Sequence, residues 1–205
     1  MARSQSRTDR RNQILEALHA CLLVKPFYRI TIREIARQAG INHGLLHYYF
    51  ESKEEILACY IDHTFERYYA QLEQHITAIG KKERASADAI AARFRWTLEN
   101  IAFERDAARI FTGIWATAVY DESVMKKLQA FYGRWRRMVA DLLAPFVESE
   151  EKARQVGLSL MAIFEGMSLF SVIFSSREMM ADFDFPQLLA SFAAGSPESG
   201  KGGEP

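Results

Sequence analysis

The sequence predicts an all-α protein of about nine helices, in which a three-helix head precedes an antiparallel helical bundle. Apolar residues recur every three or four positions along most of the 205 residues, whereas the alternation typical of strands is almost absent. Gly and Pro residues and capping motifs divide this pattern into segments of helical length. We therefore predict helices at residues 9–24, 32–39, 43–49, 53–79, 86–105, 107–118, 122–146, 149–176 and 186–192.

Short local motifs mark the helix ends in the first sixty residues. Thr31-Ile-Arg-Glu34 and Ser52-Lys-Glu-Glu55 are capping boxes, in which a hydroxyl and a carboxylate bind free backbone N–H groups at a helix start. Gly40 can adopt the left-handed conformation that ends a helix, and Asn42 is a suitable N-cap two residues later. Two short helices joined at Gly40 form a helix-turn-helix arrangement.

Charge is distributed unevenly along a chain whose formal net charge is zero. Residues 1–53 contain nine Lys and Arg against four Asp and Glu, so the rest of the chain carries the acidic excess. A basic N-terminal quarter on an acidic body indicates one module attracted to polyanions, although such an excess is also common on solvated surfaces.

The cysteine content, the N-terminus and the hydropathy indicate where in the cell the protein is located. Two cysteines, Cys21 and Cys59, provide neither a disulfide framework nor a metal cluster, and the polar N-terminus lacks the apolar core of a signal peptide. Residues 156–174 are long enough to span a bilayer, but Glu165 lies at their midpoint, where a carboxylate is costly. We therefore expect a cytoplasmic protein with no membrane partner, in which residues 156–174 form a buried, interface-forming helix.

Apolar and polar side chains separate within the predicted head. Leu46 and Phe50 lie one turn apart and would anchor the second short helix to the core. The remaining residues of that helix would face away and, with flanking side chains, could contact the phosphates and base edges of DNA. The candidate DNA-binding residues are Thr31, Arg33, Asn42, His43, Gly44, Leu45, His47, Tyr48 and Lys53.

The segment ITIREIARQAGINHGLLHYYFESKEEIL, residues 30–57, resembles the DNA-binding head of the TetR family of bacterial repressors. The matching positions are Thr31, Ile35, Ala36, Ala39, Gly40, Gly44, Leu46, Tyr49, Phe50, Ser52, Lys53 and Leu57. Asn42 replaces the usual Ser or Thr, His43 stands where Lys is frequent, and His47 replaces the first Tyr of the aromatic run. These departures affect the prediction of which DNA base sequence the head recognises, and they do not affect the predicted docking of the head on DNA. The resemblance implies a homodimer whose two heads occupy successive major-groove faces of a near-palindromic operator.

His43 and His47 raise an alternative, because histidines four residues apart share one face of a helix and form half of a zinc site. A site needs three or four ligands, and no Cys, Asp or Glu shares that face. We therefore expect no metal and no other cofactor. The sequence also lacks a Gly-rich phosphate loop, a nucleophile elbow and a Cys–His pair in a catalytic context, so we expect no catalytic residues and no enzyme activity.

The body, residues 54–194, is rich in aromatic and Met side chains, which usually form a bundle core but can also line an adaptable apolar cavity. The segment RIFTGIWATAVYDESVMKKLQAFYGRWRRMVADLLAP, residues 109–145, resembles the C-terminal domain of BetI-type repressors of the betaine pathway. The resemblance implies a small-molecule effector bound in this bundle. Glu165 beside aromatic rings would suit a cation, and a position at the surface or at an interface stays an equal alternative for this residue. The candidate ligand-binding residues are Trp96, Phe103, Phe111, Trp115, Trp135, Phe164 and Met167.

The last two predicted helices, at 149–176 and 186–192, carry more apolar residues than one buried face needs. Such an excess, with small residues between the large ones, favours a symmetric contact between two copies of the chain. In the TetR family the corresponding helices of both subunits form a four-helix bundle. The candidate dimer-interface residues are Leu158, Met161, Gly166, Leu169, Phe185, Leu188 and Phe192.

These patterns predict a helix-turn-helix DNA-binding domain at 1–53, a ligand-binding and dimerisation domain at 54–194, and a disordered tail at 195–205. The predicted function is that of a ligand-responsive transcriptional regulator, acting as a repressor, which a small molecule releases from its DNA operator. Two alternatives stay open: an activator with the same head, and a small-molecule or metal-binding helical module without specific DNA binding. The sequence does not specify the effector, the operator or the regulated genes.

Overall fold

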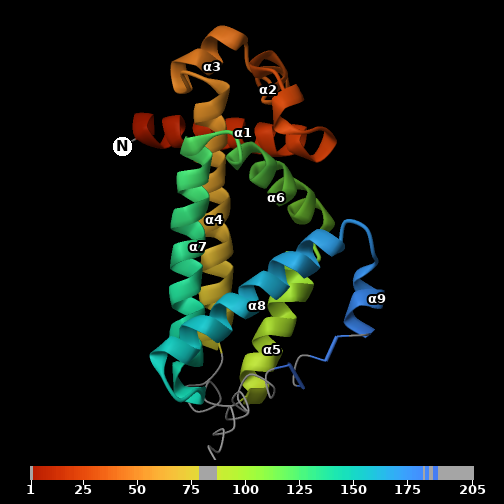
Figure 1. The fold of residues 1–205 in the computed structure, drawn as a ribbon. Helices are drawn as coiled ribbons and strands as arrows, with labels where there is room; N and C mark the ends of the chain where they lie inside the picture. The colour runs from red at the N-terminus through yellow and green to blue at the C-terminus, as the bar shows by residue number, and fades with distance from the viewer. Residues whose placement is uncertain (1, 79–86, 182, 185–186, 189–205) are drawn as a thin grey trace, which may run out of the picture.

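The computed structural model describes residues 2–78, 87–181, 183–184 and 187–188 (Figure 1). It confirms the all-α prediction, because these residues contain no strand. No helix in this part of the chain combines the length and the apolar character needed to cross a bilayer. The helices are α1 (Ala2–Val24), α2 (Ile32–Gln38), α3 (His43–Tyr49), α4 (Lys53–Ala78), α5 (Ala87–Thr97), α6 (Arg105–Ala118), α7 (Glu122–Leu143), α8 (Glu150–Phe170) and α9 (Ser176–Ala181).

The helices form a head and an elongated body (Figure 1). α1, α2 and α3 lie at one end, and α4 leaves this head and runs along the body beside α7. α8 crosses the body obliquely and packs on α7, and α5 contacts α4. α6 contacts both α1 and α7, so it bridges the head and the body. This arrangement places a single continuous helix, α4, between the two regions.

One buried cluster continues from the head into the body. Leu18 of α1 and Leu46 of α3 belong to the same cluster as Ile61 of α4, Ile114 of α6 and Leu128 of α7. α2 and α3 have only seven residues each, and helices this short depend on tertiary packing for their stability. The head is therefore held in place by the helices that also form the body. The division at residue 53 stays a prediction.

Two helices differ from their predicted bounds near the start and middle of the chain. α1 begins at Ala2, whereas the prediction started this helix at Asp9. The prediction missed the first turns because they are polar and carry no apolar periodicity. The predicted helix at 86–105 ends early. α5 stops at Thr97 and continues as a π-helical turn over Leu98–Ala102, which Phe103 N closes by donating to Leu98 O at 2.8 Å.

The predicted helix at 149–176 is also too long. α8 ends at Phe170, and the next residues form a turn in which Phe174 N donates to Phe170 O at 2.8 Å. A capping box then starts α9: Ser175 Oγ accepts from Glu178 N at 3.3 Å, and Ser175 N donates to Glu178 Oε2 at 3.1 Å. The sequence pattern did not predict the end of α8, because residues 172–174 in the turn are also apolar. The predicted helix at 186–192, apart from residues 187–188, and the tail at 195–205 lie outside the described residues.

Gly40 joins α2 to α3 with a φ of +65°, the value that the helix-turn-helix prediction requires. A Cβ at this position would meet nothing within 4 Å, so Gly40→Ala should destabilise the protein only through its backbone, by about 1–2 kcal/mol. Urea denaturation would measure the loss. Gly44→Ala is the matched control, because its Cβ would lie at an ordinary 3.5 Å from Asn42 Oδ1 and should cost no stability. Equal losses for both variants would contradict this assignment.

Candidate functional site

The two short helices of the head begin with the caps that the sequence predicts. Thr31 Oγ1 accepts from Glu34 N at 3.3 Å, and Thr31 N donates to Glu34 Oε2 at 2.8 Å, which completes a capping box. Asn42 Oδ1 accepts from Leu45 N at 2.7 Å at the start of α3. These bonds satisfy backbone N–H groups that the short helices leave without an internal partner. They also fix the angle at which α3 leaves the turn.

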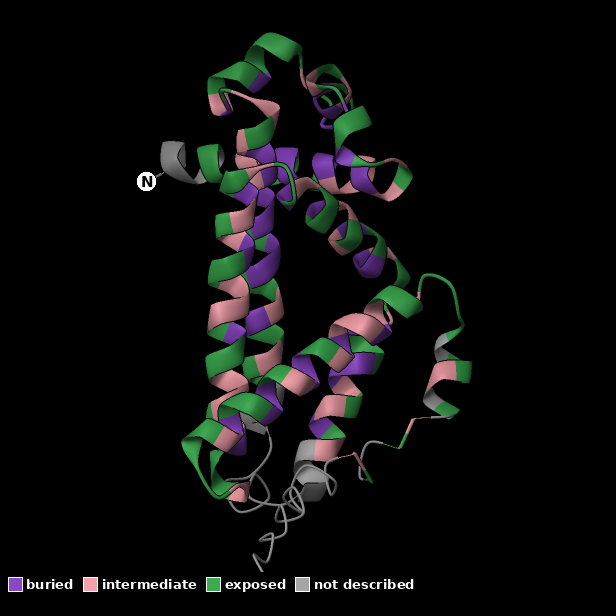
Figure 2. Cartoon of the chain, viewed as in Figure 1, coloured by how far each residue is buried: buried purple, intermediate pink, exposed green. Residues whose placement is uncertain are grey.

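The outer face of α3 collects most of the candidate DNA-binding residues. Leu46 and Phe50 are buried and turn one side of α3 toward the core. The opposite side is exposed (Figure 2). The candidate residues at the start and on the exposed side of α3 are Asn42, His43, Gly44, Leu45, His47 and Tyr48. Thr31 and Arg33, at the start of α2, are also exposed.

The two histidines of this surface contact each other. His43 Nε2 and His47 Nε2 lie 3.2 Å apart, and the rings meet edge to face with centroids 4.5 Å apart. One imidazole can therefore donate to the other while the remaining N–H stays available to a ligand. The described residues contain no group of three or more His, Cys, Asp and Glu arranged to hold a metal ion.

Lys53 has a structural role that the sequence did not reveal. Its Nζ donates to Ile30 O at 3.0 Å and to Phe27 O at 3.3 Å, and it lies 4.4 Å from the centre of the Phe27 ring. The ammonium group thus fastens the start of α4 to the connection between α1 and α2. Lys53 is therefore half-buried, whereas the other candidate DNA-binding residues are exposed.

Side chains of α1 hold the far ends of α2 and α3, and sequence reasoning did not identify them. Arg11 Nη1 donates to Tyr49 O at 2.6 Å, and its guanidinium lies 4.0 Å from the Phe50 ring centre. Gln13 Nε2 donates to Ala39 O at 2.7 Å. The last carbonyls of a helix lack internal partners, so these bonds dock both helices on α1. The segment RRNQ at residues 10–13 carries no pattern that distinguishes these side chains from solvated ones.

The capping box also predicts a pH dependence. Hydrogen bonds from Lys25 Nζ, at 2.5 Å, and from Thr31 lower the pKa of Glu34 from 4.5 to about 2. The stabilisation by Glu34 is therefore complete above pH 4.5 and is lost as the pH falls from 4.5 through about 2. In this window, thermal unfolding of Glu34→Gln should depend less on pH than that of the unmodified chain. Lys25→Met should give an intermediate slope, and an unchanged slope in both variants would contradict the assignment.

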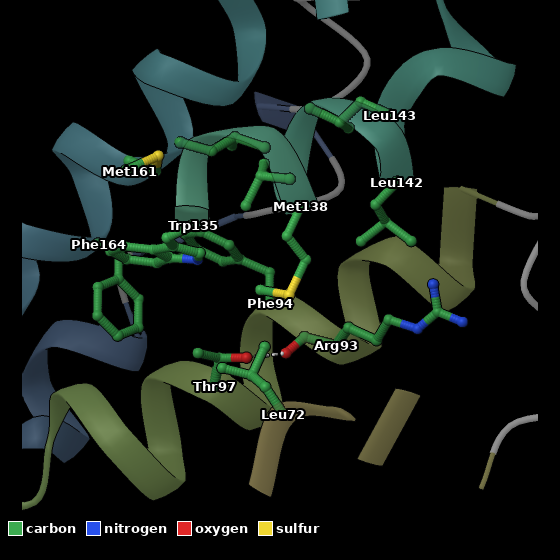
Figure 3. Close-up of a pocket in the computed structure, with 12 residues that line it drawn as sticks. Leu72, Arg93, Phe94, Thr97, Trp135, Met138, Leu142, Leu143, Met161 and Phe164 are labelled. Carbon is green, nitrogen blue, oxygen red and sulfur yellow. Dashed lines mark hydrogen bonds between the residues drawn. The ribbon is translucent and has the colours of Figure 1, made fainter. Parts of the chain in front are cut away.

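Two neighbouring cavities lie in the body between α4, α5, α7 and α8. The first has a volume of about 70 Å³ and the second, which extends to α6, about 40 Å³. Leu72, Thr97, Trp135 and Phe164 line both and separate them. The first is shown in Figure 3, and its other lining residues are Arg93, Phe94, Met138, Val139, Leu142, Leu143, Leu160 and Met161. The other lining residues of the second are Tyr68, Tyr69, Ile101, Ala102, Phe111, Phe131 and Ser168.

The candidate ligand-binding residues divide into three groups. Trp135 and Phe164 line both cavities, and Phe111 lines the second. The surrounding cluster contains three others that line neither cavity: Trp96, Phe103 and Met167. Trp115 is nearly half exposed and donates from Nε1 to the hydroxyl of Tyr132 at 3.0 Å. The aliphatic lining residues were missed, because their spacing is the same as that of ordinary core residues.

Glu165 lies outside the lining of both cavities. Its Oε1 accepts from the Tyr132 hydroxyl at 2.9 Å, so Trp115, Tyr132 and Glu165 form a chain of hydrogen bonds across α6, α7 and α8. Burial raises the pKa of Glu165, and burial together with the nearby carboxylate raises the pKa of Tyr132. The carboxylate therefore links α8 to α7, a role that differs from both positions considered from the sequence, facing a ligand or lying at a surface or interface.

α8 separates its apolar residues between two faces. Met161, a candidate interface residue, is buried in the core of the subunit and lines the first cavity, so it offers no surface to a second copy. Leu158 and Leu169 are 55% and 51% exposed, and Gly166 lies near them with no atom within 4 Å of a Cβ. Leu188 is half-buried, and Phe185 and Phe192 lie outside the described residues. The exposed apolar surface continues through Phe170, Val172, Ile173 and Phe174.

Comparison with known proteins matches both parts of the chain. Residues 14–59 match the family described as bacterial regulatory proteins, tetR family, and residues 86–182 match the BetI-type transcriptional repressor C-terminal family. An uncharacterised HTH-type transcriptional regulator of Xanthobacter autotrophicus is 28% identical over 83% of this chain and 82% of its own. The regulator BetI of Serratia proteamaculans is 24% identical over 80% and 81%.

A solved structure shares the fold. The structure of a transcriptional regulator from Saccharomonospora viridis, in complex with choline, superposes with a TM-score of 0.71. The match covers 91% of this chain and 96% of the other, at 18% identity. This likeness extends over both the head and the body, and it supports the arrangement of the helices.

Proposed function

The chain belongs to the TetR family of bacterial regulatory proteins, and we propose that it is a ligand-responsive repressor of transcription. It would bind a near-palindromic operator as a homodimer in the cytoplasm and be released by a small molecule held in the body. The observation that carries this proposal is the exposed outer face of α3, which is anchored from behind by Leu46 and Phe50.

The exposed face of α3 has the chemistry and the size to enter a major groove. The Tyr48 hydroxyl, the imidazole of His47 and the amide of Asn42 can donate to phosphates or to base edges. Gly44 removes a side chain near the start of the helix, which lets the backbone approach the DNA closely. Arg7 adds charge, since its guanidinium lies 5.9 Å from the ring centre of Tyr48.

α4 supports coupling between the body and the head. Ile56 and Leu57 are buried in the head, whereas Leu72, farther along the same helix, lines both cavities. A ligand that enlarges the cavities would displace α4 and change the orientation of the head. It would favour a conformation that does not fit the operator, and it would therefore shift the population away from the DNA-bound state.

Binding to DNA from the region upstream of its own gene would test this proposal. At matched salt the protein should bind one such fragment at least about 1,000-fold more tightly than random duplex. Equal affinity would leave a small-molecule or metal-binding module as the better assignment. A reporter gene placed downstream of the bound fragment distinguishes a repressor from an activator. Deleting the gene for this protein should raise reporter expression if the protein is a repressor and lower it if the protein is an activator. Choline, which is bound by the similar structure, is one compound to test as an effector.

A substitution of His47 on the outer face of α3 tests its role in DNA binding. His47 stands where the family pattern has Tyr and is exposed, so His47→Tyr should keep the fold and should preserve or strengthen operator binding. Titration of the labelled fragment would measure this affinity. Loss of binding to all DNA by this variant, with unchanged thermal stability, would show that His47 has been given the wrong role.

A further inference from the structure

The cavities of the body offer an almost entirely apolar surface to a ligand. The polar groups that line them are mostly occupied by the protein itself. Thr97 Oγ1 donates to Arg93 O at 2.8 Å, and the Tyr69 hydroxyl donates to Phe131 O at 2.6 Å. A ligand with several hydrogen-bonding groups would lose its water and gain few partners here. Hydrocarbon, by contrast, loses nothing by leaving water for this site.

A cationic ligand finds no counter-charge among the described residues that line these two cavities. No carboxylate among them lines either cavity, and Glu165 is bonded to Tyr132 outside both. The charged side chain that does line the first cavity is a cation, Arg93, and its guanidinium points away from Trp135 (Figure 3). Of the two aromatic rings that line both cavities, Trp135 and Phe164, one already has a face covered by the other, because they meet edge to face with their centroids 4.9 Å apart.

The division of the space into two cavities indicates the shape of the ligand. Leu72, Thr97, Trp135 and Phe164 separate volumes of about 70 and 40 Å³. At 10–15 Å³ for each water-sized group, the two volumes hold roughly seven to eleven such groups in total. A compact molecule would fill one cavity only, whereas an unbranched chain could pass between the separating side chains and occupy both.

We propose that the effector of this regulator is a molecule with an uncharged, unbranched aliphatic chain of about eight to ten carbons, and not a quaternary ammonium compound. This inference rests on the proposed function, because it names the chemistry of the ligand that the body would hold. The chain occupies both cavities and displaces Trp135 and Leu72. Its affinity comes from the burial of methylene groups.

Titration of the full-length protein with straight-chain primary alcohols from hexanol to dodecanol tests the proposal, with tryptophan fluorescence and calorimetry as readouts. Binding should be saturable and should tighten about fourfold for each added methylene. It should stop tightening near ten carbons, when both cavities are full. Choline should show no saturable binding. Binding of choline more tightly than decanol, or affinity independent of chain length, would overturn the proposal.

Matched variants locate the binding site. Met138 lines the first cavity and is partly exposed, so Met138→Phe should fill the cavity and weaken decanol binding at least tenfold. Met138→Leu conserves volume and should bind within threefold of the unmodified protein. Glu165→Gln should leave decanol binding unchanged. Unchanged binding in Met138→Phe would place the ligand elsewhere and overturn the assignment.

The same titrations distinguish this inference from the proposed function. If decanol binds as described but leaves the operator complex intact, the ligand class holds and the proposed release mechanism fails. If choline dissociates the operator complex, the release mechanism holds and the proposed ligand class is wrong. Operator binding in the absence of ligand is measured separately. A protein that does not bind the operator is therefore distinguished from one that binds the operator but is not released by decanol or by choline.

Discussion

Leu46→Ala is expected to unfold the head and abolish operator binding. The Leu46 side chain is 0% exposed and lies in the cluster that joins α1, α3 and α4. Removing a fully buried leucine costs about 2–5 kcal/mol, because transfer energy is lost and a cavity remains. α3 has only seven residues and cannot hold its conformation without this anchor. Urea denaturation followed by circular dichroism, together with operator titration, would measure both effects.

Leu45→Ala is the control for this prediction, since it makes the same chemical change at the next position of the same helix. Leu45 is 37% exposed and faces outward, so its truncation should change the free energy of unfolding by less than about 1 kcal/mol. Any change in operator affinity would then report a DNA contact. Similar destabilisation by both variants would show that α3 is rotated relative to the arrangement described here.

The head could be predicted from sequence because its signals are local. Thr31 with Glu34, Gly40 and Asn42 each fix a backbone feature within three residues of themselves, and the structure shows those caps and that turn. The docking of α1 could not be predicted in this way. Arg11 lies 38 residues from the carbonyl of Tyr49 that it binds, and nothing in its neighbourhood distinguishes it from a solvated arginine.

The sequence predicted that the body could contain an apolar cavity, but it could not predict which residues line the two cavities. Periodicity shows which side of a helix is buried, but a lining residue and a packed core residue have the same periodicity. Trp115 and Trp135 both occur in aromatic-rich helical segments, yet one is nearly half exposed and the other lines both cavities. Trp115 of α6 packs beside Tyr132 of α7, whereas Trp135 of α7 packs against Phe164 of α8, and no sequence pattern specifies these contacts between helices.

Leu169→Arg is expected to convert the proposed dimer into monomers and to weaken operator binding by at least about 100-fold. Leu169 is 51% exposed in the subunit, so the variant should fold normally. In a symmetric interface the change is present twice, and each uncompensated charge taken out of water costs several kcal/mol. A monomer also loses the gain of binding two half-sites at once, which is typically about 100- to 10,000-fold. Sedimentation velocity and operator titration would measure the two losses.

Val119→Arg is the control for this change, because Val119 is 62% exposed and is also apolar. It lies at the end of α6 that approaches the start of α7, far from the last turns of α8 (Figure 1). Adding a charge there should leave the dimer and the operator affinity unchanged. If Leu169→Arg remains a dimer with normal affinity, then the exposed apolar surface of α8 is not where two copies meet. If it becomes a monomer that still binds the operator tightly, the need for a dimer in DNA recognition is disproved instead.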